Sequence, residues 1–148
     1  MSYKGHIFGG IITYLIALII INCWYPIAPI QALGWFFICL LGAIFPDIDT
    51  TSKMRALFLR LCIGVFLILA VLPSQQIMVI PLLPLIAIPL MARHRGIFHN
   101  KLFLIGVPLT IALVLISTLH SHQPALVIIP TLFFVAGSCS HLILDKRW

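Results

Sequence analysis

The side chains of this sequence that could carry out chemistry are few, and most of them are of the kind that binds metal ions. The chain holds three carboxylate side chains and six histidines. All three carboxylates and four of the histidines lie at the edges of apolar runs: His6, Asp47, Asp49, His94, His99, His141 and Asp145. Mixed imidazole and carboxylate donors suit zinc, manganese or iron, and the donor types do not choose between these metals.

The spacing of two pairs supports coordination. His141 and Asp145 are four residues apart, so on a helix they project from one face, one turn apart. Asp47 and Asp49 are two apart, and both can point the same way if the chain is extended where it leaves a helix. Three small residues near His141 should let its helix pack closely on its neighbours and hold the imidazole in place: Gly137, Ser138 and Ser140.

The segment HRGIFHN adds two more imidazoles. His94 and His99 are five residues apart, and Gly96 between them permits a sharp loop that turns both rings inward. Arg93 and Arg95 flank His94 and are candidates for binding a phosphate through bidentate hydrogen bonds. Seven nitrogen and oxygen donors in all are enough for two metal ions with open coordination positions.

The positions of two carboxylates raise an electrostatic question. Asp47 and Asp145 are both expected at the C-terminal ends of helices, where the helix dipole disfavours an anion. Each therefore needs a compensating cation. An arginine or lysine could supply it in a salt-bridged cluster, whereas a metal ion would also use the neutral imidazoles. We favour the metal ion and keep the salt-bridged cluster as the alternative.

The composition is that of an integral membrane protein. Of the 148 residues, 62% are hydrophobic and 8% are charged, and the mean hydropathy is +1.20. A soluble domain of this size needs far more polar surface. The four cysteines have no C-x-x-C spacing and are expected to be packing residues. We expect one transmembrane domain over residues 1–148, with no room for a soluble domain.

Six apolar runs approach the length that crosses a membrane, which is roughly 20 helical residues. They cover residues 7–24, 31–46, 56–72, 76–91, 102–119 and 124–144. The fourth is the weakest, because its three prolines each remove a backbone donor, and it is expected to be kinked or re-entrant. We therefore predict an all-α integral membrane protein, a compact bundle of about six short transmembrane helices.

The distribution of charge tests this count. With six spans, all nine lysine and arginine residues fall on one side of the membrane. The positive-inside rule places that side, with both termini, in the cytoplasm. The seven candidate ligands lie on the same side, whereas His120 and His122 lie on the other. Because this topology accounts for the net charge of +6, we expect membrane lipids and not nucleic acid as partners.

The motifs together resemble a known family, the YdjM-like, LexA-regulated inner-membrane proteins. The resemblance runs through nearly the entire chain. It consists of an early histidine, a proline–aspartate–x–aspartate in LGAIFPDID, the loop HRGIFH, and a late G-x-x-x-H-x-x-x-D in GSCSHLILD. Each motif is short, but four of them in this order form a specific pattern.

The resemblance implies a metal-dependent hydrolase of the bacterial inner membrane that belongs to the SOS response. The family is similar to zinc-dependent phospholipases C and nucleases, which implies a phosphoester substrate and one to three divalent ions, with zinc first and Mn²⁺ or Fe²⁺ as alternatives. This sequence departs from the family where the loop normally ends threonine–histidine–serine and here reads Phe98, His99, Asn100. We expect Asn100 to contact the substrate, as the two arginines of the loop do.

The leading hypothesis is therefore a hydrolase at the cytoplasmic membrane surface. A metal ion lowers the pKa of a bound water, and Asp47 or Asp49 accepts its proton as the catalytic base. A lipid phosphoester fits the location, because headgroups lie at the depth of the expected site.

Two other functions explain parts of the sequence. A small metal- or ion-binding transporter would explain ionisable residues in a membrane protein and the proline-broken run 76–91. However, no acid is expected at the middle of the bilayer. A non-catalytic structural or stress-response membrane protein would explain the nine basic residues. It would not explain why all three acids accompany four histidines.

Overall fold

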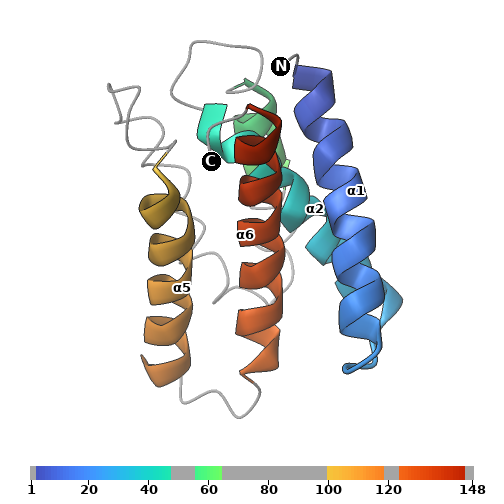
Figure 1. The fold of residues 1–148 in the computed structure, drawn as a ribbon. Helices are drawn as coiled ribbons and strands as arrows, with labels where there is room; N and C mark the ends of the chain where they lie inside the picture. Colours follow the sequence, from blue (N-terminus) through green and yellow to red (C-terminus); the bar gives the residue numbers. More distant parts are fainter. Residues whose placement is uncertain (1–2, 48–55, 65–99, 119–123, 146–148) are drawn as a thin grey trace. The chain divides into compact units, whose positions relative to one another are not determined.

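The computed structural model of this chain describes residues 3–47, 56–64, 100–118 and 124–145 (Figure 1). The chain divides into two compact units. The first unit consists of Met1–Pro46 and Gly96–Trp148, and the second consists of Asp47–Arg95. The first unit contains four long helices, and residues 56–64 of the second unit are also helical.

All regular structure in the described residues is helical, so the predicted all-α class is confirmed for them. The long helices are α1 (Tyr3–Asn22), α2 (Pro29–Ile44), α5 (Lys101–Thr118) and α6 (Ala125–Leu144), and a short 3-10 turn, η1 (Phe45–Asp47), continues α2. All four long helices are long and apolar enough to cross a membrane. They correspond to the predicted spans 7–24, 31–46, 102–119 and 124–144.

The other two predicted spans are not tested. Residues 56–64 form the described start of the predicted span 56–72, and the predicted span 76–91 lies outside the described residues. The count of six therefore stays a prediction.

Prolines mark both ends of α2. Pro29 occupies the first turn, where its missing N–H has no helical partner in any case, and the N–H of Ala28 donates to Gln31 Oε1 at 3.1 Å. At the other end, Pro46 lacks the N–H that would bond the carbonyl of Gly42, and the helix gives way to η1. The acidic motif therefore begins at the carboxyl end of α2.

Helix α1 has an outer face that suits lipid. Six large apolar side chains, 43–69% exposed, recur there at helical spacing: Phe8, Ile12, Leu15, Ile16, Ile19 and Ile20. The buried residues His6, Gly10 and Tyr14 follow one another at four-residue intervals on the inner face. Apolar surface of this extent is unfavourable in water, whereas a membrane helix turns it toward lipid.

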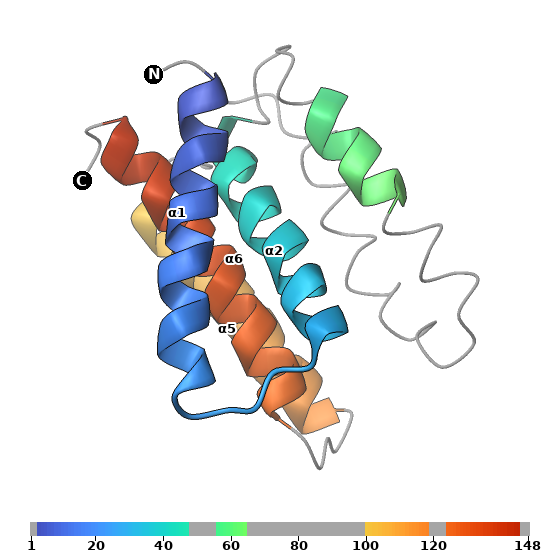
Figure 2. The same cartoon turned by 90° about the vertical axis from the view of Figure 1, so that its right-hand side faces the viewer.

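Helix α6 contacts each of the other three long helices of the first unit. Figures 1 and 2 show that consecutive long helices run in opposite directions, so that α1 begins, α2 ends, α5 begins and α6 ends at the same end of this unit. We call this end the polar end. An even number of spans agrees with this arrangement, because α5 begins at the end where α2 finishes. Which side of the membrane the polar end faces stays a prediction.

A cluster of large side chains joins α1, α2 and α6. We call it the aromatic cluster, and its buried members are Tyr14, Trp35, Cys39, Ile129 and Phe133. The rings of Trp35 and Phe133 stack with centroids 5.4 Å apart, and the Tyr14 ring lies 5.6 Å from that of Phe133. The Tyr14 hydroxyl donates to the carbonyl of Ala32 at 2.8 Å. All four cysteines are free thiols; Cys39 and Cys62 are buried, in agreement with a packing role, whereas Cys23 is exposed.

Nearer the polar end, α2 and α6 touch through their main chains. A Cβ atom on Gly137 would overlap the carbonyl oxygen of Cys39, and one on Gly42 would overlap that of Phe134. Small residues allow such close approach between membrane helices. We call this contact the Gly42–Gly137 seam. It agrees with the close packing expected from the small residues near His141.

Candidate metal centre

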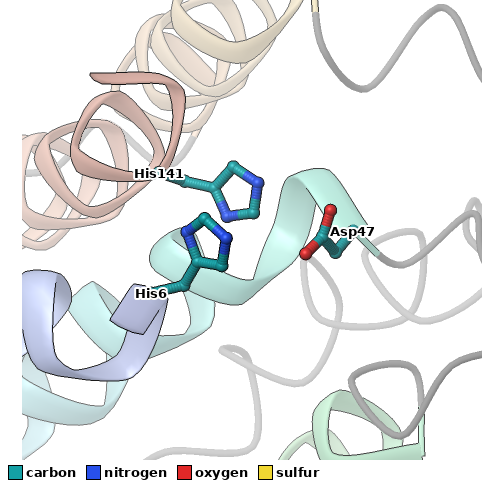
Figure 3. A group of neighbouring side chains, drawn as sticks. All are labelled: His6, Asp47 and His141. Atoms are coloured by element: carbon teal, nitrogen blue, oxygen red, sulfur yellow. The ribbon is translucent and has the colours of Figure 1, made fainter. Parts of the chain in front are cut away.

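Two buried imidazoles face each other at the polar end. His6 lies near the start of α1, and His141 lies in the last turn of α6. Their residues are 1% and 0% exposed, and their rings stack with centroids 3.8 Å apart and planes 16° from parallel (Figure 3). Burying a polar ring is costly unless its nitrogens find partners, so these partners define the chemistry of the site.

Asp145 reaches both rings. It is the C-cap residue of α6, one turn after His141, as the four-residue spacing predicts. Its Oδ1 lies 3.3 Å from Nε2 of His6, and its Oδ2 lies 3.6 Å from Nε2 of His141. We call His6, His141 and Asp145 the imidazole–carboxylate cluster. All three residues belong to the first unit.

A hydrogen bond to α2 determines which nitrogen of His141 carries a proton. Nδ1 of His141 lies 2.8 Å from the carbonyl oxygen of Ala43. A carbonyl can only accept, so Nδ1 must donate, and in the neutral ring Nε2 then carries the lone pair. Metal-binding histidines commonly have this arrangement, in which the second ring nitrogen donates to a backbone carbonyl.

The lone pair of His141 Nε2 therefore faces a carboxylate oxygen. A neutral Nε2 and an ionised Asp145 are both hydrogen-bond acceptors, so their approach at 3.6 Å calls for a compensating positive charge. A metal ion would supply this charge, and so would a proton that makes His141 an imidazolium. Two imidazoles and a carboxylate are ordinary ligands of zinc, so the residues of the cluster fit a divalent metal ion.

The surroundings keep Asp145 ionised. It lies at the negative end of the α6 dipole, which disfavours an anion. Partial burial raises the pKa of Asp145, but opposing interactions, with His141 and His6 among them, outweigh this, and the pKa lies below its ordinary value. A carboxylate that is ionised at neutral pH is in the form that binds a metal ion.

Asp47 is a fourth candidate ligand near these rings. It ends η1, and so it continues α2 directly. Figure 3 shows Asp47 with the two histidines, and one ligand atom from each of the three residues lies within 4.8 Å of the others. Zinc holds nitrogen and oxygen ligands at about 2.0–2.2 Å, so two ligands of one ion are at most about 4.4 Å apart.

Asn100, predicted to contact a substrate, caps the start of α5. Its Oδ1 accepts a hydrogen bond from the N–H of Leu102 at 2.9 Å, and its carbonyl accepts one from Leu104 at 3.0 Å. Side-chain oxygens at this position satisfy N–H groups that have no partner within the helix. This role is structural, and the substrate contact stays a prediction.

Five of the predicted site residues lie outside the described part of the chain: Asp49, Arg93, His94, Arg95 and His99. Their roles as ligands, base or phosphate-binding groups stay predictions. The described candidates His6, Asp47, His141 and Asp145 come from both ends of the sequence and lie together at the polar end.

Sequence reasoning missed two groups that position His141. One is the carbonyl of Ala43, which carries no sequence signal because every residue has one. The other is Gly42, which lies four residues before the start of the motif PDID, just as Gly137 lies four residues before His141. A glycine one turn before each ligand motif is a signal that could have pointed to the contact between α2 and α6.

Comparison with known proteins bears on the whole chain. Residues 1–148 match the family model described as YdjM inner membrane protein. No curated protein matches the chain, and no solved structure matches it either. The family match covers every helix described above and all the candidate ligands.

Proposed function

This chain belongs to the YdjM inner membrane protein family, and from that premise we propose that it is a metal-dependent hydrolase whose active site lies at the polar end. One observation carries the proposal: Nδ1 of His141 is committed to a carbonyl, so that Nε2 faces the carboxylate of Asp145. His6 stacks on the same ring and reaches the same carboxylate. Ionisable groups buried in a membrane protein are costly to maintain and commonly mark function.

The proposed ligands combine the described residues with those known only from the sequence: His6, Asp47, Asp49, His94, His99, His141 and Asp145. Zinc suits this donor set first, with Mn²⁺ and Fe²⁺ as alternatives, and the number of donors allows one to three ions. When bound, such an ion acts as a Lewis acid and lowers the pKa of a coordinated water toward neutrality.

The chain's own residues would move the proton and hold the substrate. Asp47, which is partly exposed, or Asp49 would accept the proton of the attacking water. Arg93 and Arg95 would bind the phosphate oxygens through paired N–H groups. Asn100 precedes α5 at the polar end and follows the two arginines closely in the sequence. It would contact the substrate.

The surroundings of the cluster favour a substrate with an apolar part. Close to the two histidines along α1 and α6, Phe8 and Ile143 are 64% and 57% exposed. Lys4 and Lys101 are exposed at the polar end, and lysines at a membrane surface attract anionic headgroups. We therefore propose a lipid phosphoester as substrate and, by the positive-inside rule, the cytoplasmic face as the location.

Hydrolysis of a lipid phosphoester would test this proposal. The purified protein, loaded with zinc or manganese in mild detergent, would be mixed with phosphatidic acid or phosphatidylglycerol, and release of phosphate or headgroup would be measured. We expect His141→Ala, Asp49→Ala and His99→Ala to abolish hydrolysis. His122→Ala, expected on the other side of the membrane, should retain it. Equal activity in all four variants would contradict the assignment.

A metal-free, ion-paired cluster is the second candidate, and the distances to Asp145 also favour it. If His141 carried protons on both nitrogens, it would donate to Ala43 and attract Asp145, which lies 3.6 Å away. His6, 3.3 Å from the other carboxylate oxygen, would add a second contact between α1 and α6. A chelator would leave the stability of such a cluster unchanged, whereas it would lower that of a metal-bound protein.

A further inference from the structure

We propose that the Gly42–Gly137 seam positions the metal centre, because it holds the carbonyl of Ala43 where that carbonyl directs Nε2 of His141 toward the metal. This inference rests on the proposed metal-dependent function and extends it to residues that contain no ligand atom. Gly42, Gly137 and Ser138 are then positioning residues, and metal affinity depends on the main-chain contact between α2 and α6.

The first step concerns the helix-ending proline. Because Pro46 has no N–H, the carbonyl of Gly42 lacks its usual partner four residues ahead. It accepts instead from the N–H of Phe45, and the hydroxyl of Ser138 lies 3.2 Å away. The single proton of that hydroxyl is shared with the carbonyl of Phe134 in its own helix, at 3.0 Å. The fully buried Ser138 therefore ties the last turn of α2 to α6.

The second step concerns the two glycines. A Cβ on Gly137 would overlap the carbonyl oxygen of Cys39 and lie 2.9 Å from the backbone nitrogen of Ala43. A Cβ on Gly42 would overlap the carbonyl oxygen of Phe134. These obstacles are main-chain atoms, which cannot rotate away as a flexible side chain can. A side chain at either position would therefore force α2 and α6 apart, and Ala43 would move with α2.

The third step concerns the tolerance of the His141 hydrogen bond. The distance from Nδ1 to the Ala43 oxygen is 2.8 Å, and at 3.6 Å no hydrogen bond remains, so a separation of about 0.8 Å abolishes it. Without it, the carboxylate of Asp145 favours the tautomer of His141 that carries its proton on Nε2, the atom that would bind the metal. Losing such a partner of a metal-binding histidine typically weakens metal binding about 10- to 100-fold.

The chain offers a matched pair of variants on one helix. Gly42→Ala inserts a methyl group into the seam, whereas a Cβ on Gly34, also in α2, meets no atom within 4 Å. Zinc affinity would be measured by competition with a chelating dye. The His141 tautomer would be read by ¹⁵N NMR of histidine-labelled, metal-free protein, with the His141 signal assigned by its loss in His141→Gln. We expect Gly42→Ala to weaken zinc binding about 10- to 100-fold and to lose the Nδ1-protonated signature. Gly34→Ala should change neither.

A milder variant covers the case in which Gly42→Ala does not fold. Ser138→Ala removes only the hydroxyl that joins the two helices, and it should weaken zinc binding about threefold with a mixed tautomer signal. Its control is Thr131→Val, which removes a hydroxyl that bonds only within α6, to the carbonyl of Val127 at 2.8 Å. This control should leave both readouts unchanged.

The outcomes separate this inference from the proposed function. An unchanged tautomer and unchanged zinc affinity in Gly42→Ala and Ser138→Ala would overturn the inference, even if the wild type binds zinc. If the wild type binds none of zinc, Mn²⁺ and Fe²⁺, but its His141 is protonated at Nδ1 and Gly42→Ala changes this, the seam does position His141 and the metal-dependent function is wrong.

Discussion

The aromatic cluster lies on α1, α2 and α6, whereas the imidazole–carboxylate cluster lies on α1 and α6 and receives one backbone carbonyl from α2, and the two are built in different ways. In the aromatic cluster, the rings of Trp35 and Phe133 fill the space between helices, and Tyr14 adds one hydrogen bond. At the polar end, α2 and α6 touch through main-chain atoms at glycines. The polar end also encloses two imidazoles and a carboxylate, which the aromatic cluster does without.

This difference gives separate expectations for the two regions. Aromatic packing and close backbone contact account for the association of α1, α2 and α6. His6 and His141 are buried as well, and burying polar rings is costly. Polar groups that are retained against such a cost commonly belong to functional sites. The predictions below separate stability in one region from metal binding in the other.

The largest expected effect on stability comes from the aromatic cluster. Phe133 is fully buried between α2 and α6, and Phe133→Ala should lower the free energy of unfolding by about 3–5 kcal/mol. The metal content of the folded fraction should not change, because Phe133 belongs to the aromatic cluster and that cluster contains no candidate ligand. Denaturation in mixed micelles and elemental mass spectrometry would measure the two quantities. Loss of metal from protein that remains folded would show that the regions are coupled.

A smaller effect is expected from the Tyr14 hydrogen bond of that cluster. Tyr14→Phe keeps the ring and removes the hydroxyl that donates to Ala32. Hydrogen bonds between membrane helices contribute about 0.6 kcal/mol on average, and we expect a loss of this size in the same unfolding experiment. Zinc affinity should equal that of the wild type. A loss of several kcal/mol would mean that polar contacts, and not packing, dominate this cluster.

Much of the fold could be predicted because a membrane constrains it strongly. Apolar runs and prolines located four of the helices, since each run must satisfy its own backbone groups as a helix. The start of α1 was predicted at residue 7, but the helix begins at Tyr3 and includes His6. Polar residues were taken as flanks of the span, whereas a helix can continue through them when their side chains find partners. The span count depends on residues outside the described part of the chain.

The site could be predicted in its residue types but not in its geometry. The spacing of His141 and Asp145 predicted that they lie on one face of a helix. The expected positions of Asp47 and Asp145 at helix ends predicted that each carboxylate needs a compensating cation. The stacking of His6 on His141 and the bond from His141 to Ala43 could not be predicted. The first depends on how closely α1 and α6 approach and the second on how closely α2 and α6 approach. Tertiary packing decides both distances, and local sequence does not.

The central claim is that the imidazole–carboxylate cluster binds a metal ion, and metal content per chain tests it most directly. Elemental mass spectrometry would compare the wild type with His141→Ala, His6→Phe and the control His122→Ala, each purified in mild detergent without a histidine tag. We predict one or more equivalents of metal in the wild type and in His122→Ala, and a large loss in the other two. His6→Phe should remain folded, because a phenyl ring preserves the stacking on His141. No metal in the wild type after incubation with zinc and manganese, or the same content in all four proteins, would contradict the claim.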